Sequence, residues 1–205
     1  MTFRHCANRR WVALLALLPI IGCAAEPTSE EPPAPTAVAT ESLEVPFTVE
    51  RIRGEWTPGL TLVLHFNFPD RQEWQRWTVV AADANGAEIA YQPLDAQGQP
   101  VAPPQRAPSS WTDLRDHALF PAAESRRERA SRETTMGELE GWLYTVHDPQ
   151  AETMTEFFFA DELPGAPVWM ETRRGEEVIL TVNQIARQRL PVPPAGGPET
   201  APGQG

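Results

Sequence analysis

The chain has 205 residues, and its 17 basic residues, all of them arginine, face 28 acidic ones, which gives a formal net charge of −11. This length fits one domain with appendages better than two full domains. The acidic excess repels nucleic-acid phosphates and nearly rules out a DNA-binding role. Two cysteines are too few for a disulfide framework or a cysteine-rich metal site.

The first 22 residues have the pattern of a bacterial secretory signal. Arg4, Arg9 and Arg10 form a basic start, and an apolar run follows from Trp11 to Ile21. This run is too short to span a bilayer, which needs about 20 apolar residues. We therefore predict that residues 1–22 are a signal peptide.

The apolar run ends in Ile20-Ile21-Gly22-Cys23, which resembles the lipobox of bacterial lipoproteins. The resemblance implies cleavage between Gly22 and Cys23, a diacylglycerol on the Cys23 thiol and acylation of the new α-amino group. It also implies a palmitate-type lipid anchor in the cell envelope, and Ala24 after the cysteine implies the outer membrane in a host that has one. The alternative is an ordinary secretory signal with an incidental cysteine.

Two segments are too rich in proline and too poor in apolar residues to form a packed core. Residues 23–44 combine the lipidated cysteine with a proline- and glutamate-rich stretch, and we predict a disordered tether there. Residues 191–205 are rich in proline and glycine and are predicted to be a disordered tail. The globular domain is therefore expected at 45–190.

Alternating apolar residues predict strands throughout this domain. The longest alternation places Leu60, Leu62, Leu64, Phe66 and Phe68 on one face of a strand. Further strands are predicted at 76–82, 87–92, 140–147, 154–160, 168–173 and 177–186, with turns at 83–86, which contains Asn-Gly, and at 174–176.

One short helix is predicted to begin at Ser110-Trp111-Thr112-Asp113, which resembles a capping box, and to end before Pro121. Residues 93–108 are expected to be a long loop, and 122–132 either further helical turns or a charged loop. The predicted fold class is mostly β (α+β), an antiparallel sheet with one short helix.

Few residues carry recognisable chemistry. No catalytic, phosphate-binding or metal-binding motif is present in the sequence, so we predict no enzyme activity, no cofactor and no metal. His65 is expected to be a solvated strand residue, and His117 with Asp113 and Asp116 a solvated helix face more readily than a metal pair. A basic cluster could contact an anionic surface, but interleaved acids favour an ion-paired segment: Arg126, Arg127, Arg129 and Arg132.

The aromatic residues give this small domain much aromatic area. Phe157-Phe158-Phe159 point to both faces of one strand, so both faces must be covered, or one of them must meet a ligand. The following Leu163-Pro164-Gly165-Ala166-Pro167-Val168 segment and the strands around it, over residues 140–186, are distantly similar to LolA- and LolB-like lipoprotein carriers. That resemblance implies a curved antiparallel sheet wrapped around a helix, with acyl chains held on the concave side.

These observations predict a membrane-anchored envelope lipoprotein with a non-catalytic domain that binds a hydrophobic or lipid ligand. The candidate ligand face consists of Leu62, Leu64, Phe66, Phe157 and Phe159. The alternative is a structural or assembly accessory that contacts other envelope proteins. A hydrolase is a third and weaker interpretation.

Overall fold

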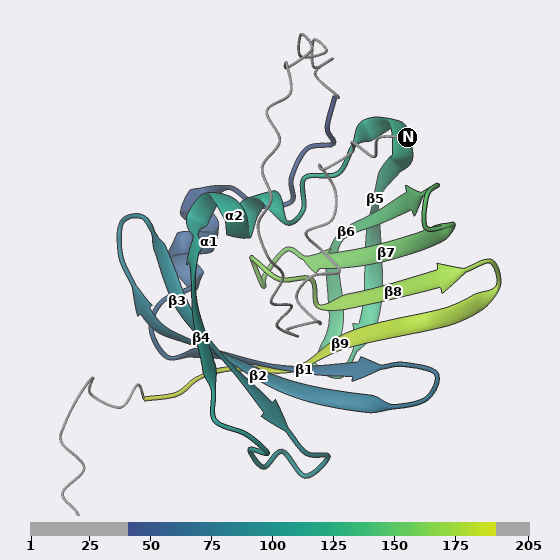
Figure 1. Cartoon of the computed structure of the whole chain (residues 1–205). Coiled ribbons are helices and arrows are strands. Elements are labelled where there is room, and N and C mark those ends of the chain that lie inside the picture. Colours follow the sequence, from purple (N-terminus) through teal and green to yellow (C-terminus); the bar gives the residue numbers. More distant parts are fainter. Residues whose placement is uncertain (1–40, 192–205) are drawn as a thin grey trace, which may run out of the picture. The chain divides into compact units, whose positions relative to one another are not determined.

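The computed structural model describes residues 41–191 (Figure 1). The predicted signal peptide, Cys23 and residues 192–205 of the predicted tail lie outside the described residues, as does the tether up to residue 40. No helix in the described range is long and apolar enough to cross a membrane.

The described chain is mostly β, as predicted. Its elements, in chain order, are α1 (Val49–Glu55), β1 (Leu60–Asn67), β2 (Gln72–Ala82), β3 (Gly86–Leu94), β4 (Gln105–Ser110), α2 (Trp111–Asp116), the 3₁₀ turn η2 (Ala122–Glu124), β5 (Ser125–Thr134), β6 (Gly137–Asp148), β7 (Thr153–Ala160), β8 (Trp169–Arg174) and β9 (Glu177–Arg189).

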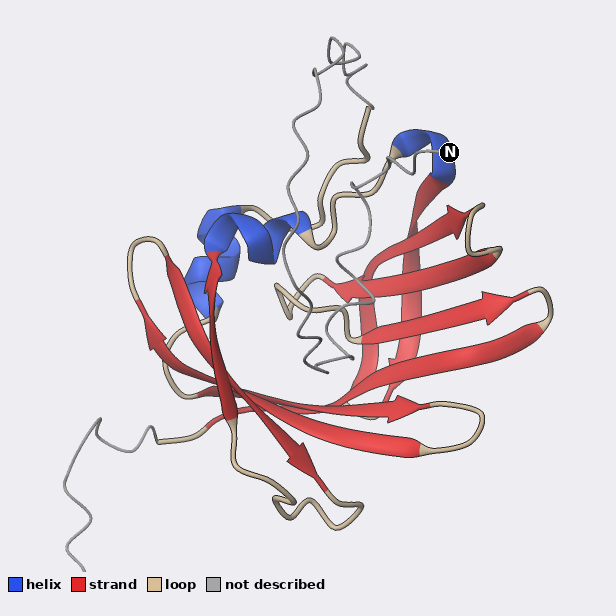
Figure 2. Cartoon of the chain, viewed as in Figure 1, coloured by secondary structure: helices blue, strands red, loops and turns tan. Residues whose placement is uncertain are grey.

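The strands form one antiparallel sheet in the order β4-β3-β2-β1-β9-β8-β7-β6-β5. Every neighbour is also a neighbour in sequence except the central pair, where the first strand meets the last. The sheet is strongly curved and is not closed, so β4 and β5 are its two edges (Figure 2).

The register of β1 defines the concave face. Leu62 lies opposite Trp77 of β2 and Arg187 of β9, and Leu60, Leu64 and Phe66 point to the same side because strand side chains alternate. All four apolar residues are buried. The long alternation in the sequence therefore corresponds to a strand with its apolar side turned into the curve of the sheet.

Two short helices cover part of that face. Thr48 caps α1 by accepting a hydrogen bond from the Arg51 N–H, and Ser110 caps α2 by accepting one from the Asp113 N–H at 3.0 Å. These helices and the segments beside them contribute a set of buried side chains to the main core: Phe47, Ile52, Trp56, Trp111 and Phe120. The Ser110 cap confirms the start that the sequence predicted for α2.

The three consecutive phenylalanines confirm that both faces of β7 are covered. Phe157 and Phe159 join the concave core, whereas Phe158 packs on the opposite face with Val168 and Trp169. The exposed fraction is 5 % for Phe157, 0 % for Phe158 and 1 % for Phe159. All three are therefore covered within the chain itself.

The structure corrects four expectations. Residues 125–134 form the edge strand β5 instead of helical turns or a loop, and β4 begins within the predicted 93–108 loop. The helix α1 was not predicted. Residues 41–44 of the predicted disordered tether are held against the domain, because the Leu43 N–H donates to the Phe120 carbonyl at 2.9 Å and Ser42 bridges Pro121.

Candidate ligand-binding face

The structure divides the predicted ligand face into two parts. Leu62, Phe157 and Phe159 lie in the main core, where the chain's own side chains fill the space. Phe47 and Tyr144 both meet the Phe159 ring edge-on, with centroids 6.3 and 5.5 Å away. These three predicted residues therefore have a structural role in the described chain.

Leu64 and Phe66 belong to a separate apolar cluster, which we call the outer floor. It also contains Val182, and four half-buried residues complete it: Phe68, Trp77, Met170 and Leu180. Two of these, Trp77 and Met170, also pack against the main core. All the strands that contribute are central or next to central: β1, β2, β8 and β9. Neither α1 nor α2 adds a side chain to this cluster.

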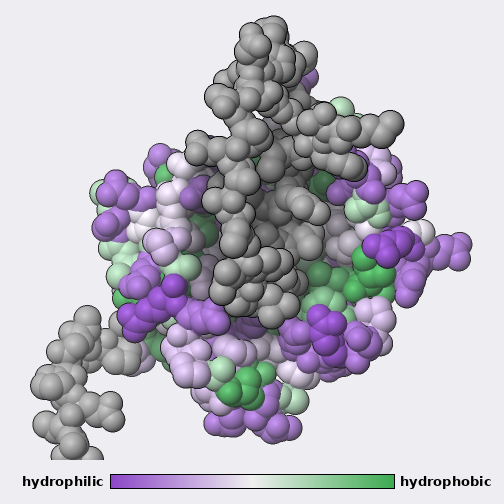
Figure 3. Space-filling model, viewed as in Figure 1, coloured by the Kyte–Doolittle hydropathy of each residue, from purple (hydrophilic) through white to green (hydrophobic). Residues whose placement is uncertain are grey.

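On the side drawn in Figure 3, most of the visible described surface is hydrophilic, and a group of hydrophobic residues lies at the right, near β8. Leu64, Phe66 and Val182 are each at most 9 % exposed, so the centre of the outer floor is buried while its margin is only half-buried.

Sequence reasoning missed most of the outer floor, because this cluster forms only when strands far apart in the sequence pair with each other. Val182 lies opposite both Phe66 of β1 and Met170 of β8. Trp77 lies opposite Leu62 and stacks edge-on against Tyr91 at 5.3 Å. The alternation within 177–186 was a usable signal for Leu180 and Val182, but it did not reveal their partners.

Two polar residues of β9, the buried Gln184 and Arg187 with its nearly buried side chain, interrupt this apolar face. They flank an irregularity in the β1–β9 register, where Val63 pairs with Ala186 but Leu64 pairs with Gln184. Gln184 is 1 % exposed, and its Oε1 has no hydrogen-bond partner. A bulge of this kind redirects side chains and is common beside functional sites.

Arg187 is the more unusual of the two. Its side chain is 8 % exposed, and its Nη2 donates to the Pro164 carbonyl at 3.3 Å and lies 4.0 Å from the Glu55 carboxylate. Its Nη1 is buried without a hydrogen-bond partner. Burial lowers the pKa of Arg187 to about 10, although Glu55 acts in the opposite direction.

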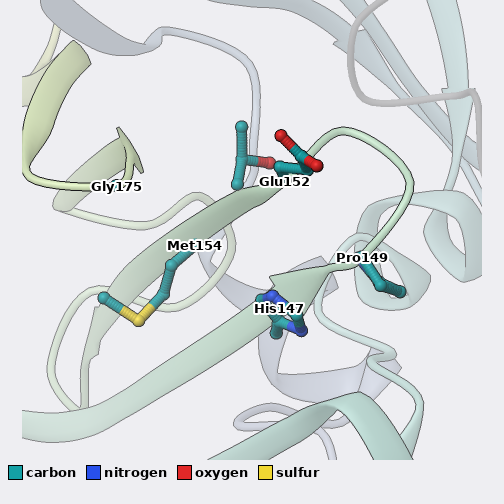
Figure 4. Close-up of a pocket in the computed structure, with 6 residues that line it drawn as sticks. His147, Pro149, Glu152, Met154 and Gly175 are labelled. Carbon is teal, nitrogen blue, oxygen red and sulfur yellow. The ribbon is translucent and has the colours of Figure 1, made fainter.

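Two shallow cavities of the described surface are lined by residues outside the outer floor. One of about 420 Å³ is lined by His147, Pro149, Glu152, Thr153, Met154 and Gly175, at the ends of β6 and β7 (Figure 4). Another of about 280 Å³ lies along Gln72–Gln75 and Pro93–Asp95, with Val101 beside them. Their linings combine charged, amide and apolar side chains, so neither provides an enclosed apolar space.

The histidines are arranged differently from one another. His65 is half-buried instead of solvated, because its ring stacks on Trp74 with centroids 4.7 Å apart, and its Nε2 is buried without a hydrogen bond. The Nδ1 of His117 lies 2.5 Å from the Asp113 carbonyl oxygen. Within residues 41–191 no group of three or more metal-ligating side chains is found.

The basic cluster is engaged within the chain, which favours the ion-paired interpretation. Arg127 pairs with Glu44 at 2.8 Å, and Arg129 pairs with Asp161 at 2.7 Å. Both guanidinium groups also lie over the Trp142 ring. Arg132 covers Trp169 with its guanidinium carbon 3.2 Å from the ring centroid. These contacts attach the edge strand β5 to the sheet.

Comparison with known proteins adds no family assignment. No protein-family model matches the chain, and no curated protein matches it significantly.

Proposed function

We propose that the chain is a membrane-anchored lipoprotein of the cell envelope whose β domain binds a hydrophobic or lipid ligand on the outer floor. One observation carries the proposal. On the concave side of an unclosed sheet, Leu64, Phe66 and Val182 form a cluster whose described members come from β1, β2, β8 and β9 and from Phe68 just after β1, and from no helix. The other part of that face is covered by helical side chains.

The chemistry of the outer floor suits an acyl chain. Its side chains are aliphatic, aromatic and thioether groups, which offer contacts without directional requirements. Each methylene that leaves water for such a surface gains about 0.8 kcal/mol. A ligand of several methylenes would therefore bind measurably even after the cost of association.

The membrane part of the proposal is supported by the sequence around Cys23. A basic start, an apolar run and a lipobox-like tetrapeptide occur in the expected order before it. Two or three acyl chains anchor a protein stably, whereas one does not. The anchor would hold the domain close to a source of lipid.

Met170→Gln tests the proposed ligand face, and Met154→Gln is its matched control. Met170 is half-buried in the outer floor, whereas Met154 is 39 % exposed beside the shallow cavity of Figure 4. The measurement is native mass spectrometry of the full chain, extracted from its own host with a non-ionic detergent. We expect the wild type and Met154→Gln to retain a non-covalent lipid, and Met170→Gln to retain several-fold less.

Two results would contradict this proposal. One is a wild-type protein that retains no lipid beyond its covalent modification. The other is equal retention by the two methionine variants, because the same change would then have the same effect on and off the outer floor.

A specific observation favours the second candidate function, an accessory that contacts other envelope proteins. Leu62, Phe157 and Phe159 are buried under the chain's own residues, so much of the concave side is a filled core. If the wild type retains no lipid but is crosslinked in the cell to one defined envelope protein, the accessory function is the better explanation.

A further inference from the structure

The bulged part of β9 combines a surplus positive charge with an unused hydrogen-bond donor. Glu55 and Arg189 are the charged groups that act on Arg187. Glu55 also pairs with Arg189, at 3.4 Å. Two guanidinium groups therefore share one carboxylate, and a local charge of +1 remains in a chain whose net charge is −11.

The contacts that Arg187 does make are long. A charge-assisted N–H···O bond is usually about 2.7–2.9 Å, whereas Arg187 reaches the Pro164 carbonyl at 3.3 Å and Glu55 at 4.0 Å. A buried N–H without a partner is uncommon in folded proteins, where such donors usually bind a protein group, an ordered water or a ligand. The planar fork of arginine matches carboxylate and phosphate oxygens.

The position of Arg187 connects this donor to the outer floor. Arg187 lies opposite Leu62 on the concave face, and Leu64 is the next residue of β1 on that side. Because a strand rises about 3.4 Å per residue, Arg187 is roughly 7 Å along the sheet from Leu64. One amphiphile could place its charged end at Arg187 and its chain on Leu64, Phe66 and Val182.

We propose that Arg187 binds the anionic head group, a carboxylate or phosphate, of the lipid whose chain lies on the outer floor. This inference rests on the proposed function and specifies its ligand as an acidic amphiphile. The head group replaces the long contact to the Pro164 carbonyl, which lies in the connection between β7 and β8.

The test compares Arg187→Met with Arg189→Met in the full chain, extracted in non-ionic detergent and incubated with defined probes. Arg189 is two residues further along the same strand, pairs with the same Glu55, and is 49 % exposed. The probes are oleate, its neutral methyl ester and phosphatidylglycerol, and retention is read by native mass spectrometry. We expect the wild type and Arg189→Met to prefer an anionic probe over methyl oleate by about 10- to 100-fold, as for a charge-assisted bond.

Arg187→Met is expected to lose this preference while it still retains methyl oleate. Preference for oleate alone identifies a carboxylate, and preference for phosphatidylglycerol alone identifies a phosphate. Unchanged preference in Arg187→Met overturns the inference and leaves the proposed function intact. If the wild type retains none of the three probes, the proposed function is overturned.

The melting temperature of each variant serves as the control for correct folding. Replacing a poorly paired buried charge with an apolar residue is often neutral or stabilising, so Arg187→Met should melt at or above the wild-type temperature. If Arg187→Met does not fold, Arg187→Gln decides the question by the same measurement, because it also removes the charge and the guanidinium fork.

Discussion

Tyr144 joins the first described residues to the core. Its side chain is completely buried, and its hydroxyl donates to the Glu44 carbonyl at 2.6 Å. Arg127 donates to the same carbonyl at 2.9 Å and pairs with the Glu44 carboxylate. Glu44 thus has a fixed position, although the composition of its segment predicted disorder.

We predict that Tyr144→Phe lowers the free energy of unfolding by about 1 kcal/mol, because the ring remains packed and only one hydrogen bond is lost. Chemical denaturation of the full chain would measure this difference. A loss of several kcal/mol would instead indicate that the aromatic packing had changed.

The same variant should change the response to alkali. Burial raises the pKa of Tyr144, so its contribution to stability is complete below the pKa of the unfolded chain, near 10, and is lost as the pH rises through the folded value. Melting temperatures of the wild type and Tyr144→Phe should therefore converge above about pH 10. A constant difference across that range would count against a buried, neutral hydroxyl.

The candidate site was only partly predictable at this scale. Leu64 and Phe66 were identified because they belong to a local alternation, which a single strand reveals. Val182 and Met170 complete the outer floor only through pairing with strands far away in the sequence. Arg187 could not be identified as buried, because nothing local distinguishes it from the exposed Arg189.

At the scale of elements, Gly141 shows how closely β6 and β7 approach each other. A Cβ at this position would overlap the backbone carbonyl of Phe159, whereas a Cβ at Gly54 in α1 would meet nothing within 4 Å. Neither glycine has a positive φ. The two positions therefore differ in the space available for a side chain and not in backbone strain.

We predict opposite effects for Gly141→Ala and Gly54→Ala. The first should destabilise the protein by about 1–3 kcal/mol, because backbone must move to admit the methyl group. The second should stabilise it by about 0.5–1 kcal/mol, since alanine is the better helix former. Thermal unfolding of the two variants would measure the contrast, and equal effects would mean that β6 can relax at Gly141 without cost.

The elements that the sequence did not predict share a physical reason. β5 combines four arginines and two glutamates with one apolar residue, Ala130, so apolar periodicity does not reveal it. Ion pairs and Arg–Trp contacts attach this edge strand to the sheet instead. β4 contains Pro108 and pairs only with β3. α1 is only seven residues long and includes Gly54. Apolar periodicity therefore predicted the central strands and failed at the margins.

At the scale of the whole molecule, Cys23 would determine where the domain is held. We predict that Cys23→Ser abolishes lipidation, because an acyl thioether needs the thiol. The variant should stay uncleaved or be cut elsewhere, and it should lose its partition into the detergent phase. Intact-mass measurement and detergent phase separation would test this, and unchanged partition without loss of acyl mass would reject the lipobox.

The open edges of the sheet have a consequence for crowding. An exposed strand presents unpaired N–H and C=O groups, onto which a strand from another copy can add. On β4, the ring of Pro108 removes one N–H donor, and on β5 the charged side chains of four arginines and two glutamates must lose water before a second strand can approach. Copies of this protein can therefore accumulate at high local concentration while edge-to-edge pairing of their sheets remains unfavourable.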